Sequence, residues 1–454
     1  MAGIFGISED AKRKLINGML ARRPPASPAA SPPATQATAR SPLGDPQRYE
    51  ELRLIRAAAA HLDLANPFFK VHEGIAGATA CIGNRQYINF ASYNYCGLNG
   101  DARVQQAAAR AIASYGTSAG ASRIVAGERP LHAELEQALA AHYAAEDCVV
   151  LVSGHATNVT VLGHLLSVGD LVLHDAFAHN SIVQGCLLSG ARRLPFPHND
   201  LHALERLLER ARPMARQALI VVEGHYSMDG DVPDLAALVA LARRHDAHVM
   251  VDEAHSLGVL GATGRGVFEH CGVDPAEVDI WMGTLSKTLA GCGGYIAGSS
   301  VMVDYLRHTA PGFVYSVAMA PPMVAAALAA LHALHAEPER VAQLHANAAL
   351  FLAEAKARSL DTGASIGAAI VPVVLGSSIR AARAAELLFE RGVNVQPIIH
   401  PAVPERAARL RFFLSSLHEP EQIRETVRLT AEAVAGAKAE SIPLADMIRL
   451  FSPR

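Results

Sequence analysis

The chain has 454 residues, which is long enough for about two or three domains that each bury an apolar core. Half of its residues are apolar, 18% are charged and the formal net charge is -3. This composition gives no indication of a nucleic-acid partner or a membrane-surface partner.

The first residues and the cysteines indicate the compartment. Residues 1–14 place acidic and basic side chains where a secretory signal would need an apolar core. The six cysteines form no C-x-x-C pair, so neither a disulfide framework nor a structural zinc site is expected. We therefore expect a cytoplasmic protein without a metal site.

A proline-rich segment, 24–45, lies close to the N-terminus. Its composition predicts an extended, semi-stiff tether. Ahead of it, Ser8 is a candidate N-cap for a short amphipathic helix that ends at residue 19 or 20. Such a helix either docks onto a partner protein or frays and packs on its own subunit, and both interpretations stay open. We assign the helix and tether to 1–48 and a further N-terminal segment to 49–90.

Short apolar runs alternate with stretches of helical spacing between residues 91 and 325. This alternation predicts an α/β domain in which helices cover both faces of a mostly parallel sheet. Ligands of such sheets bind beyond the carboxyl ends of the strands. The runs are 148–153, 171–175, 218–223, 248–253, 279–283 and 293–298, and the polar residues that close several of them are His174, Asp175, Glu223, Asp252 and Glu253.

The pattern changes near residue 326. The apolar stretch Val317–Leu331 is too short for a membrane span and contains two prolines, so it predicts a buried, Ala-rich helix that follows them. Beyond it the chain reads as helix, strand, helix, short strand, strand and a last helix from 419. This order predicts a smaller α+β domain at 326–454 beside the large domain at 91–325.

Lys287 follows one of the predicted strands, in the segment GTLSKTLAGCGGY. Its neighbours are small and apolar, which predicts burial, and burial would lower the lysine pKa and favour the neutral amine that imine chemistry needs. Taken alone, the segment fits a helix-start lysine or a phosphate loop equally well. The Walker pattern is absent because no glycine precedes Lys287.

Asp252 closes the predicted strand that comes before the one leading to Lys287. A carboxylate there suits a protonated pyridine nitrogen, and the alternative is an N-cap for the following turn. We take the adjacent Glu253 as a surface neighbour. His255 follows closely enough to reach the same ligand.

Two further segments complete a candidate cofactor site. The segment SGHATN, 153–158, follows a strand and opens a helix, so its first N–H groups can bind a phosphate. His179 stands at the start of the next helix and can stack on a ring, whereas His174 and His225 are expected to be structural. A lysine, a carboxylate, a phosphate-binding helix start and a stacking ring together indicate a pyridoxal-type cofactor.

The motifs, taken in order, resemble the α-oxoamine synthases, a branch of the fold-type-I enzymes that use pyridoxal 5'-phosphate (PLP). The resemblance runs from about residue 65 to 435. The motifs are INFASYNYCGL (88–98), GTSAGASRIVAG (116–127), SGHATN (153–158), HDAFAHNSIVQG (174–185), EGHYSMDGD (223–231), VDEAHSLGVLG (251–261), GTLSKTLAGCGGY (283–295), YSVAMAPP (315–322) and ARLRFFLSSLHE (408–419).

The resemblance implies roles at the cofactor ring. Lys287 corresponds to the Schiff-base lysine and Asp252 to the partner of the pyridine nitrogen. His255 and Ser227 correspond to the residues at the cofactor's 3-oxygen. His179 corresponds to the stacking histidine, which in this family also contacts the substrates.

The resemblance also implies roles at the phosphate and at the substrate. Gly154, His155 and Thr284 fall at phosphate-binding positions. Ser316 matches a hydroxyl that is supplied across the interface of a homodimer. Arg411 aligns with the arginine that binds the amino-acid carboxylate, where a bidentate guanidinium suits the geometry.

Two segments depart from the biotin-pathway members of the family. The segment SYNYCG, with Tyr93 as a candidate substrate-binding residue, replaces S-N-D-Y-L-G, and the segment 397–404 lacks a basic residue before its P-x-V-P turn. The S-Y-N-Y form is similar to serine palmitoyltransferases and to synthase domains of polyketide assembly lines. The runs HNSIVQGCLLSGARR and WMGTLSKTLAGCGGYIAGS look most like the polyketide-associated subgroup. These departures argue against a role in biotin or haem synthesis.

The activity implied is a decarboxylative condensation of an amino acid with an acyl thioester on coenzyme A or on an acyl carrier protein, giving an α-amino ketone. An N-terminal helix on a tether would suit a carrier protein. The alternatives are another fold-type-I activity, such as an aldolase or aminotransferase, and a non-catalytic partner subunit. The presence of Lys287, Asp252 and His179 favours an enzyme.

Overall fold

The computed structural model describes residues 64–440 and, ahead of them, 44–45, 49–50, 53, 56–57 and 59–60. The predicted N-terminal helix and nearly all of the tether lie outside the described residues. The chain divides into two compact units. Unit 1 is drawn from Met1–Val71, Val373–Leu410 and Arg428–Arg454, and unit 2 comprises His72–Pro372 and Arg411–Val427.

A seven-stranded sheet with the order β3-β9-β8-β7-β6-β4-β5 forms the centre of unit 2. Strands β4 to β8 pair in parallel, and β9 runs antiparallel to both β8 and β3. This confirms the predicted α/β fold. The strands are β3 (Asp147–Leu151), β4 (Leu171–Asp175), β5 (Arg192–Phe196), β6 (Ala218–Glu223), β7 (His248–Asp252), β8 (Ile280–Thr284) and β9 (Gly294–Gly298).

The edge strand β5 is the one member of this sheet that the apolar runs did not predict. Its sequence RRLPF carries two arginines and a proline, so it lacks an apolar run. Proline is tolerated here because an edge strand leaves one side of its ladder without a partner strand.

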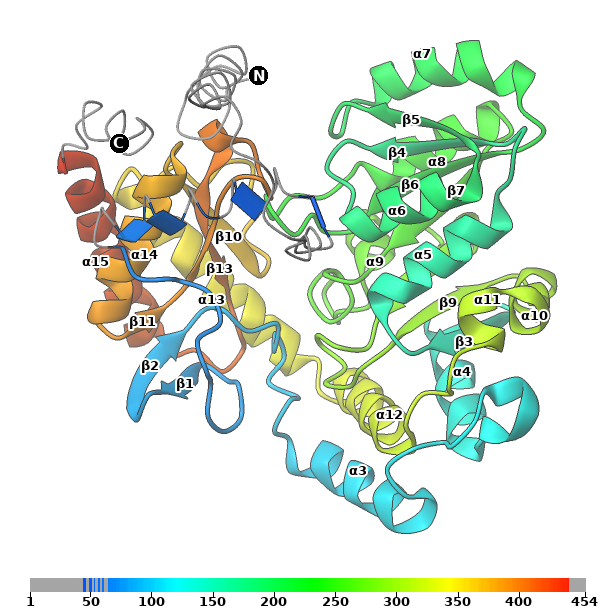
Figure 1. The fold of residues 1–454 in the computed structure, drawn as a ribbon, viewed down its shortest axis with the longest axis horizontal. Coiled ribbons are helices and arrows are strands. Elements are labelled where there is room, and N and C mark those ends of the chain that lie inside the picture. The colour runs from blue at the N-terminus through cyan, green and yellow to red at the C-terminus, as the bar shows by residue number, and fades with distance from the viewer. Residues whose placement is uncertain are drawn as a thin grey trace, which may run out of the picture. The chain divides into compact units, whose positions relative to one another are not determined.

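Helices cover both faces of this sheet (Figure 1). α5 (Gly154–Leu165) and α6 (Asn180–Ser189) pack side by side, and α7 (Leu201–Ala211) contacts α8 (Leu235–Arg244). Right-handed crossovers place these two pairs on opposite faces because the strand order reverses between them. The remaining helices of unit 2 are α3 (Ala102–Tyr115), α4 (Pro130–His142), α9 (Val267–Cys271), α10 (Ser300–Thr309), α11 (Pro311–Val314), α12 (Pro321–Ala336) and α13 (Glu339–Ala357).

The Ala-rich helix predicted after the two prolines is α12, and both prolines occupy its first turn. That position suits proline because the first N–H groups of a helix have no partner within the helix. Most of α12 is buried. Among the described residues, no helix combines the length and hydropathy needed to cross a bilayer.

The C-terminal elements follow the predicted alternation of helix and strand. A three-stranded sheet has the order β10-β13-β12, and the chain passes between the two units within β10 and within β13. Unit 2 also contains an antiparallel hairpin of β1 (Thr79–Ile82) and β2 (Arg85–Asn89). The other elements are β10 (Ile370–Val374), α14 (Ser378–Glu390), β11 (Val393–Asn394), β12 (Gln396–Ile398), β13 (Arg409–Phe413) and α15 (Pro420–Ala439).

Candidate active site

The carboxyl edge of the sheet brings the predicted site residues together. Glu223 ends β6, Asp252 ends β7 and Thr284 ends β8, with Lys287 in the loop that follows. Gly154 is the first residue of α5, and a short connection joins it to the end of β3. Parallel strands place their carboxyl ends at one edge, so residues distant in the sequence converge there.

Lys287 is half-buried and borders a cavity of about 310 Å³. Its Nζ lies 5.6 Å from the centre of the Tyr93 ring. Burial lowers the pKa of Lys287, and the nearby carboxylates of Asp252 and Glu223 offset only part of that shift. The amine therefore loses its proton more readily than a solvated lysine would.

The Asp252 carboxylate is held by one donor on each oxygen. Its Oδ1 accepts a hydrogen bond of 2.9 Å from the Ala254 N–H, and its Oδ2 accepts one of 2.9 Å from Asn158 Nδ2. The hydrogen bond from the Ala254 N–H is the contact expected if Asp252 caps the turn that follows it. The bond to Asn158 comes from α5 and fixes the plane of the carboxylate.

Asn158 is a residue of the site to which the sequence analysis assigned no role. It is buried on α5, one turn after Gly154, and its Nδ2 also lies 3.0 Å from Ser181 Oγ. Ser181 Oγ in turn lies 2.7 Å from His179 Nδ1. A hydrogen-bond chain therefore runs from Asp252 through Asn158 and Ser181 to His179. Its position one helical turn after Gly154, at the predicted phosphate-binding helix start, is the feature of the sequence that could have indicated a role for Asn158 in the site.

His179 is the N-cap of α6, and its Nδ1 accepts from the backbone N–H of Ser181 at 3.3 Å. Burial lowers the pKa of His179, although the negative charge of Asp252 opposes the shift. Because Nδ1 is an acceptor, the neutral ring carries its proton on Nε2. His179 thus has one N–H available for a ligand.

His255 is buried against aromatic rings. Its Nδ1 lies 2.8 Å from the Tyr95 hydroxyl, and its ring stacks on Phe413 at 6.2 Å between centres. Burial, followed by the positive charges of Lys287 and Arg411, holds the pKa of His255 well below its usual value. Tyr95, a second residue that the sequence analysis did not assign, therefore orients a neutral imidazole.

Arg411 on β13 approaches the loop that follows β6. Its Nη1 donates to the Ser227 carbonyl oxygen at 3.0 Å, and its guanidinium lies 4.5 Å from the centre of the Phe413 ring. Arg411 and Ser227 are both buried. The predicted carboxylate-binding arginine thus lies beside a predicted cofactor-binding residue.

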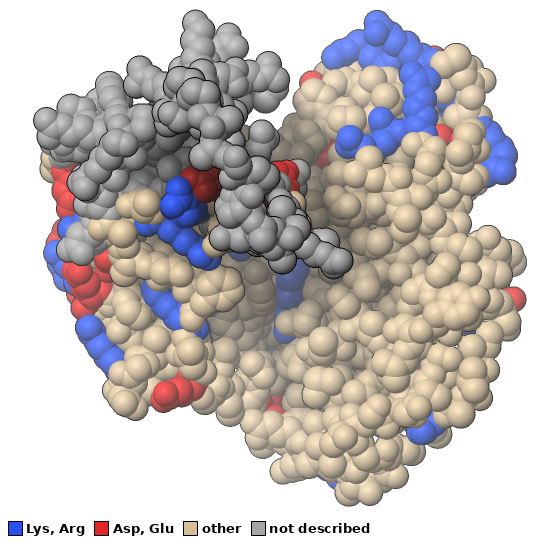
Figure 2. Space-filling view, viewed as in Figure 1, with Lys and Arg blue, Asp and Glu red and all other residues tan. Residues whose placement is uncertain are grey.

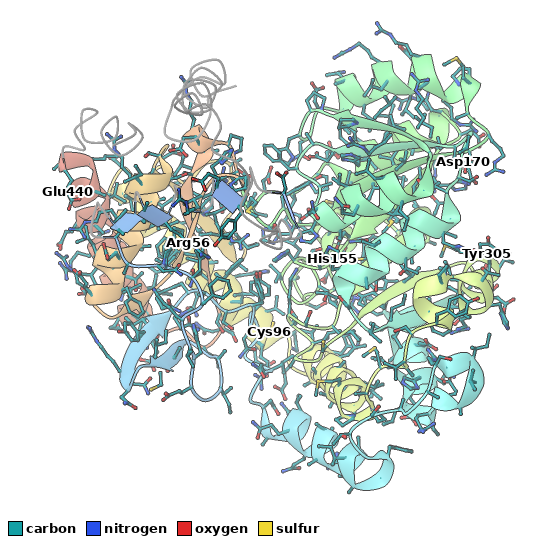
Figure 3. All side chains as sticks on the ribbon, viewed as in Figure 1. Arg56, Cys96, His155, Asp170, Tyr305 and Glu440 are labelled. Carbon is teal, nitrogen blue, oxygen red and sulfur yellow. The ribbon has the colours of Figure 1, made fainter. Side chains whose placement is uncertain are left out.

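The start of α5 makes a close contact with the end of β8. A Cβ at Gly154 would lie 2.7 Å from Thr284 Oγ1, so only glycine permits this approach. Thr284 Oγ1 lies 2.7 Å from Ser286 Oγ, which places two hydroxyls beside the helix N-terminus. His155, labelled at the start of α5 in Figure 3, is exposed, and its ring centre lies 6.3 Å from that of His179. The N–H groups of a helix start together with hydroxyls suit a phosphate.

Tyr93 and Asn94, the pair in the SYNYCG segment singled out in the sequence, have different surroundings. Tyr93 is 40% exposed, and its ring centre lies 4.9 Å from that of Phe413. Asn94 is buried, and its Nδ2 donates to the carbonyl oxygens of Ala76 and Asn99 at 3.0 and 3.2 Å. Tyr93 therefore faces Lys287, whereas the Asn94 side chain braces its own loop.

The interpretation of Glu253 as a surface neighbour is wrong. Its side chain is fully buried, and its Oε1 accepts a hydrogen bond of 3.0 Å from the Val267 N–H at the start of α9. Burial raises the pKa of Glu253 to about 8. The strand pattern placed both acids at one strand end but did not reveal that a later helix covers the second.

Ser316 is not brought to the other predicted residues. Within the described residues, the hydrogen bond found for its hydroxyl is the one of 3.2 Å that it donates to the Val317 carbonyl oxygen. His174 contacts Arg193 at 2.8 Å, and His225 Nδ1 lies 3.2 Å from the His255 carbonyl oxygen. These two histidines thus contact neighbouring protein groups, as a structural role requires.

Comparison with known proteins gives one family. The aminotransferase class I and II family matches residues 85–429. A putative 8-amino-7-oxononanoate synthase of Desulforudis audaxviator is 40% identical over 374 residues, covering 82% of this chain and 95% of the relative. The 8-amino-7-oxononanoate synthase of Geobacter metallireducens is 40% identical over 385 residues, covering 84% of this chain and 96% of the relative.

A solved structure shares most of the fold. Serine palmitoyltransferase from S. paucimobilis, with a bound PLP–myriocin aldimine, superposes with a TM-score of 0.83 and 30% sequence identity. The match covers 87% of this chain and 99% of that one. The fold-type-I architecture expected from the sequence motifs is therefore confirmed.

Proposed function

Because the chain belongs to the aminotransferase class I and II family, and within it to the α-oxoamine synthases, we propose that it condenses an α-amino acid with an acyl thioester and releases carbon dioxide. The product is an α-amino ketone. The observation that carries the proposal is the position of Lys287 and Asp252 at one sheet edge, with His179 linked to Asp252 through Asn158 and Ser181.

The described residues fit PLP, the cofactor of this family. The N-terminus of α5 with the hydroxyls of Thr284 and Ser286 suits the phosphate, and the buried Asp252 suits the pyridine nitrogen. When bound, PLP supplies an electron sink that stabilises negative charge at the amino-acid Cα. Lys287 supplies the amine that attaches it.

The binding and proton-transfer roles before the loss of carbon dioxide are assigned to side chains of this site. Arg411 binds the substrate carboxylate, and the amine of Lys287 removes the Cα proton once the substrate amino group has displaced it from the cofactor. The Asp252 carboxylate holds the proton on the pyridine nitrogen, and Asn158 keeps that carboxylate in plane. The Nε2–H of His179 donates to the thioester carbonyl oxygen as the new C–C bond forms and the thiolate leaves.

The direct test incubates the PLP-loaded protein with serine, alanine, glycine or arginine and an acyl-coenzyme A. A panel is needed because the segment around Tyr93 departs from biotin-pathway members. We expect free thiol and carbon dioxide in equal amounts with at least one pair. Exchange of keto acids without thiol release would instead indicate an aminotransferase, and a protein that cannot be loaded with PLP would indicate a non-catalytic subunit.

We also propose that the chain is a homodimer in which Ser316 reaches the partner's site. Ser316 stands between Tyr315, which is 86% exposed, and Val317, and the Ala318 N–H donates to the Ala121 carbonyl oxygen at 3.0 Å. Val125, four residues after Ala121, is 79% exposed. The surface over α4, α10 and α11 carries few charged side chains in Figure 2. Several exposed apolar side chains on a surface with few charges support a protein interface there.

Val125→Asp is expected to weaken the dimer by at least about tenfold, because burying valine stabilises an interface and an unpaired carboxylate cannot be buried there. Sedimentation velocity over a range of protein concentrations measures the effect. The matched control is Met214→Asp, since Met214 is also an exposed apolar residue but lies in the turn that follows α7. Equal dissociation of both variants, or a monomeric parent protein, would contradict the proposal.

Arg411→Lys is expected to raise the KM for the amino acid about tenfold and Arg411→Ala about a hundredfold, because each lost hydrogen bond to a carboxylate is costly. The KM for the acyl thioester should change much less. Steady-state rates with each substrate varied in turn separate the two constants. Arg358→Lys, on the exposed end of α13, is the control, and a larger effect on the thioester KM would refute the assignment.

A further inference from the structure

His198, in the connection between β5 and α7, forms a three-residue cluster that the proposed reaction leaves unexplained. Its Nδ1 lies 2.9 Å from Asp175 Oδ1, and its Nε2 lies 2.8 Å from Asp231 Oδ2. Both carboxyl groups are buried. The ring also stacks on Phe177 at 4.3 Å between centres. Two carboxylate partners require that both ring nitrogens donate, which is the protonated state of histidine.

The charge on His198 is consistent with these contacts. Burial alone lowers the pKa of His198, but the hydrogen bonds to Asp175 and Asp231 outweigh it and raise the pKa to about 10. One positive charge thus lies between two negative charges. Loss of that charge would leave two buried carboxylates without a positive charge between them, which is costly even though Asn199 also donates to both, at 2.9 Å to Asp175 Oδ2 and at 3.0 Å to Asp231 Oδ2.

Asp175 belongs to the turn that presents His179. Its Oδ1 accepts from the Phe177 N–H at 2.7 Å, and its carbonyl oxygen accepts from the Ala178 N–H at 3.1 Å. The next residue is His179, the N-cap of α6. The position of the Asp175 carboxylate therefore sets the turn from which the His179 ring projects.

Asp231 belongs to the loop that meets Arg411. The Tyr226 N–H donates to the Asp231 carbonyl oxygen at 3.0 Å, and the Gly230 N–H donates to the Tyr226 carbonyl oxygen at 2.9 Å. Gly230 has a φ of 70°, and a Cβ there would lie 2.2 Å from the Ile370 carbonyl oxygen. This closed loop contains Ser227, whose carbonyl oxygen accepts from Arg411.

We propose that His198 is a positioning residue that joins these two loops, so that the ring-stacking His179 and the carboxylate-binding Arg411 keep a fixed spacing. This role rests on the proposed function, because the spacing between His179 and Arg411 matters only if both residues act in the proposed reaction. His198 touches neither substrate nor cofactor. It acts through the turn after β4 and through the loop after β6.

The test compares His198→Gln, the double variant His198→Gln with Asp231→Asn, and the control His202→Gln, all loaded with PLP. His202 is an exposed histidine on α7. Titration of the cofactor absorbance with amino acid gives a binding constant without any thioester, and steady-state rates give both KM values. All values are normalised to bound PLP, which removes the contribution of unfolded protein.

We expect His198→Gln to weaken amino-acid binding about tenfold, because a displaced carboxylate subsite loses alignment. The double variant should recover part of this loss, since it removes one of the two opposed charges. The control should match the parent protein. Unchanged binding in His198→Gln, or a loss that the second substitution does not relieve, would overturn the proposal. The absence of condensation in the parent protein would instead reject the proposed function and leave the binding test valid.

Discussion

Replacing Lys287 by alanine is expected to lower the rate of condensation by at least about three orders of magnitude, because the variant lacks both the amine that attaches PLP and the base that removes the Cα proton. The visible absorbance of the attached cofactor should disappear at the same time. Release of free thiol from an acyl thioester measures the rate, and a spectrum of the purified protein measures the attachment.

Lys356→Ala is the matched control, because Lys356 is an exposed lysine in the last turn of α13. It should keep the absorbance and the rate of the parent protein. A Lys287→Ala protein that retained both the absorbance and full turnover would show that another residue holds the cofactor. Equal losses in both variants would point to general damage from removing a lysine.

Asp252→Asn is expected to lower the rate by about two to three orders of magnitude, because the carboxylate no longer stabilises a proton on the cofactor ring. The local geometry adds to the effect. The carboxylate now accepts from Ala254 and from Asn158, and an amide can satisfy only one of these donors with its single oxygen. The new amide nitrogen would face the nitrogen of Asn158 or the Ala254 N–H.

The effect of Asp252→Asn should appear in the cofactor absorbance as well as in the rate. Asp279→Asn serves as the control. Asp279 lies at the amino end of β8, away from the site, and its carboxylate accepts from the Val249 N–H of β7 at 2.8 Å. It should bind PLP normally and turn over at the parent rate. A rate for Asp252→Asn within about threefold of the parent would exclude the electrostatic role, since such roles contribute far more.

The site divides into parts that follow from local sequence and parts that do not. Alternation of apolar runs predicts the strands, and parallel strands bring their carboxyl ends to one edge, so the sequence pattern predicts that Asp252 and Lys287 lie at the same edge. The edge strand β5 was not predicted, because two arginines and a proline interrupt its apolar character.

The orientation of each side chain depends on partners far away in the sequence. Asn158 and Asp252 are separated by 94 positions, and no local sequence pattern indicates that their side chains form a hydrogen bond. The same holds for Glu253, whose burial depends on the later helix α9, and for His198, whose partners lie on two other loops.

The sequence alone thus determined the family, the cofactor and the sheet edge where chemistry is expected, because these depend on residue types in a fixed order. Only the tertiary structure decided which nitrogen of His179 carries its proton and that Tyr93, unlike Asn94, faces Lys287. Hydrogen-bond partners and burial are properties of the packed chain, and periodicity along the sequence contains no record of them.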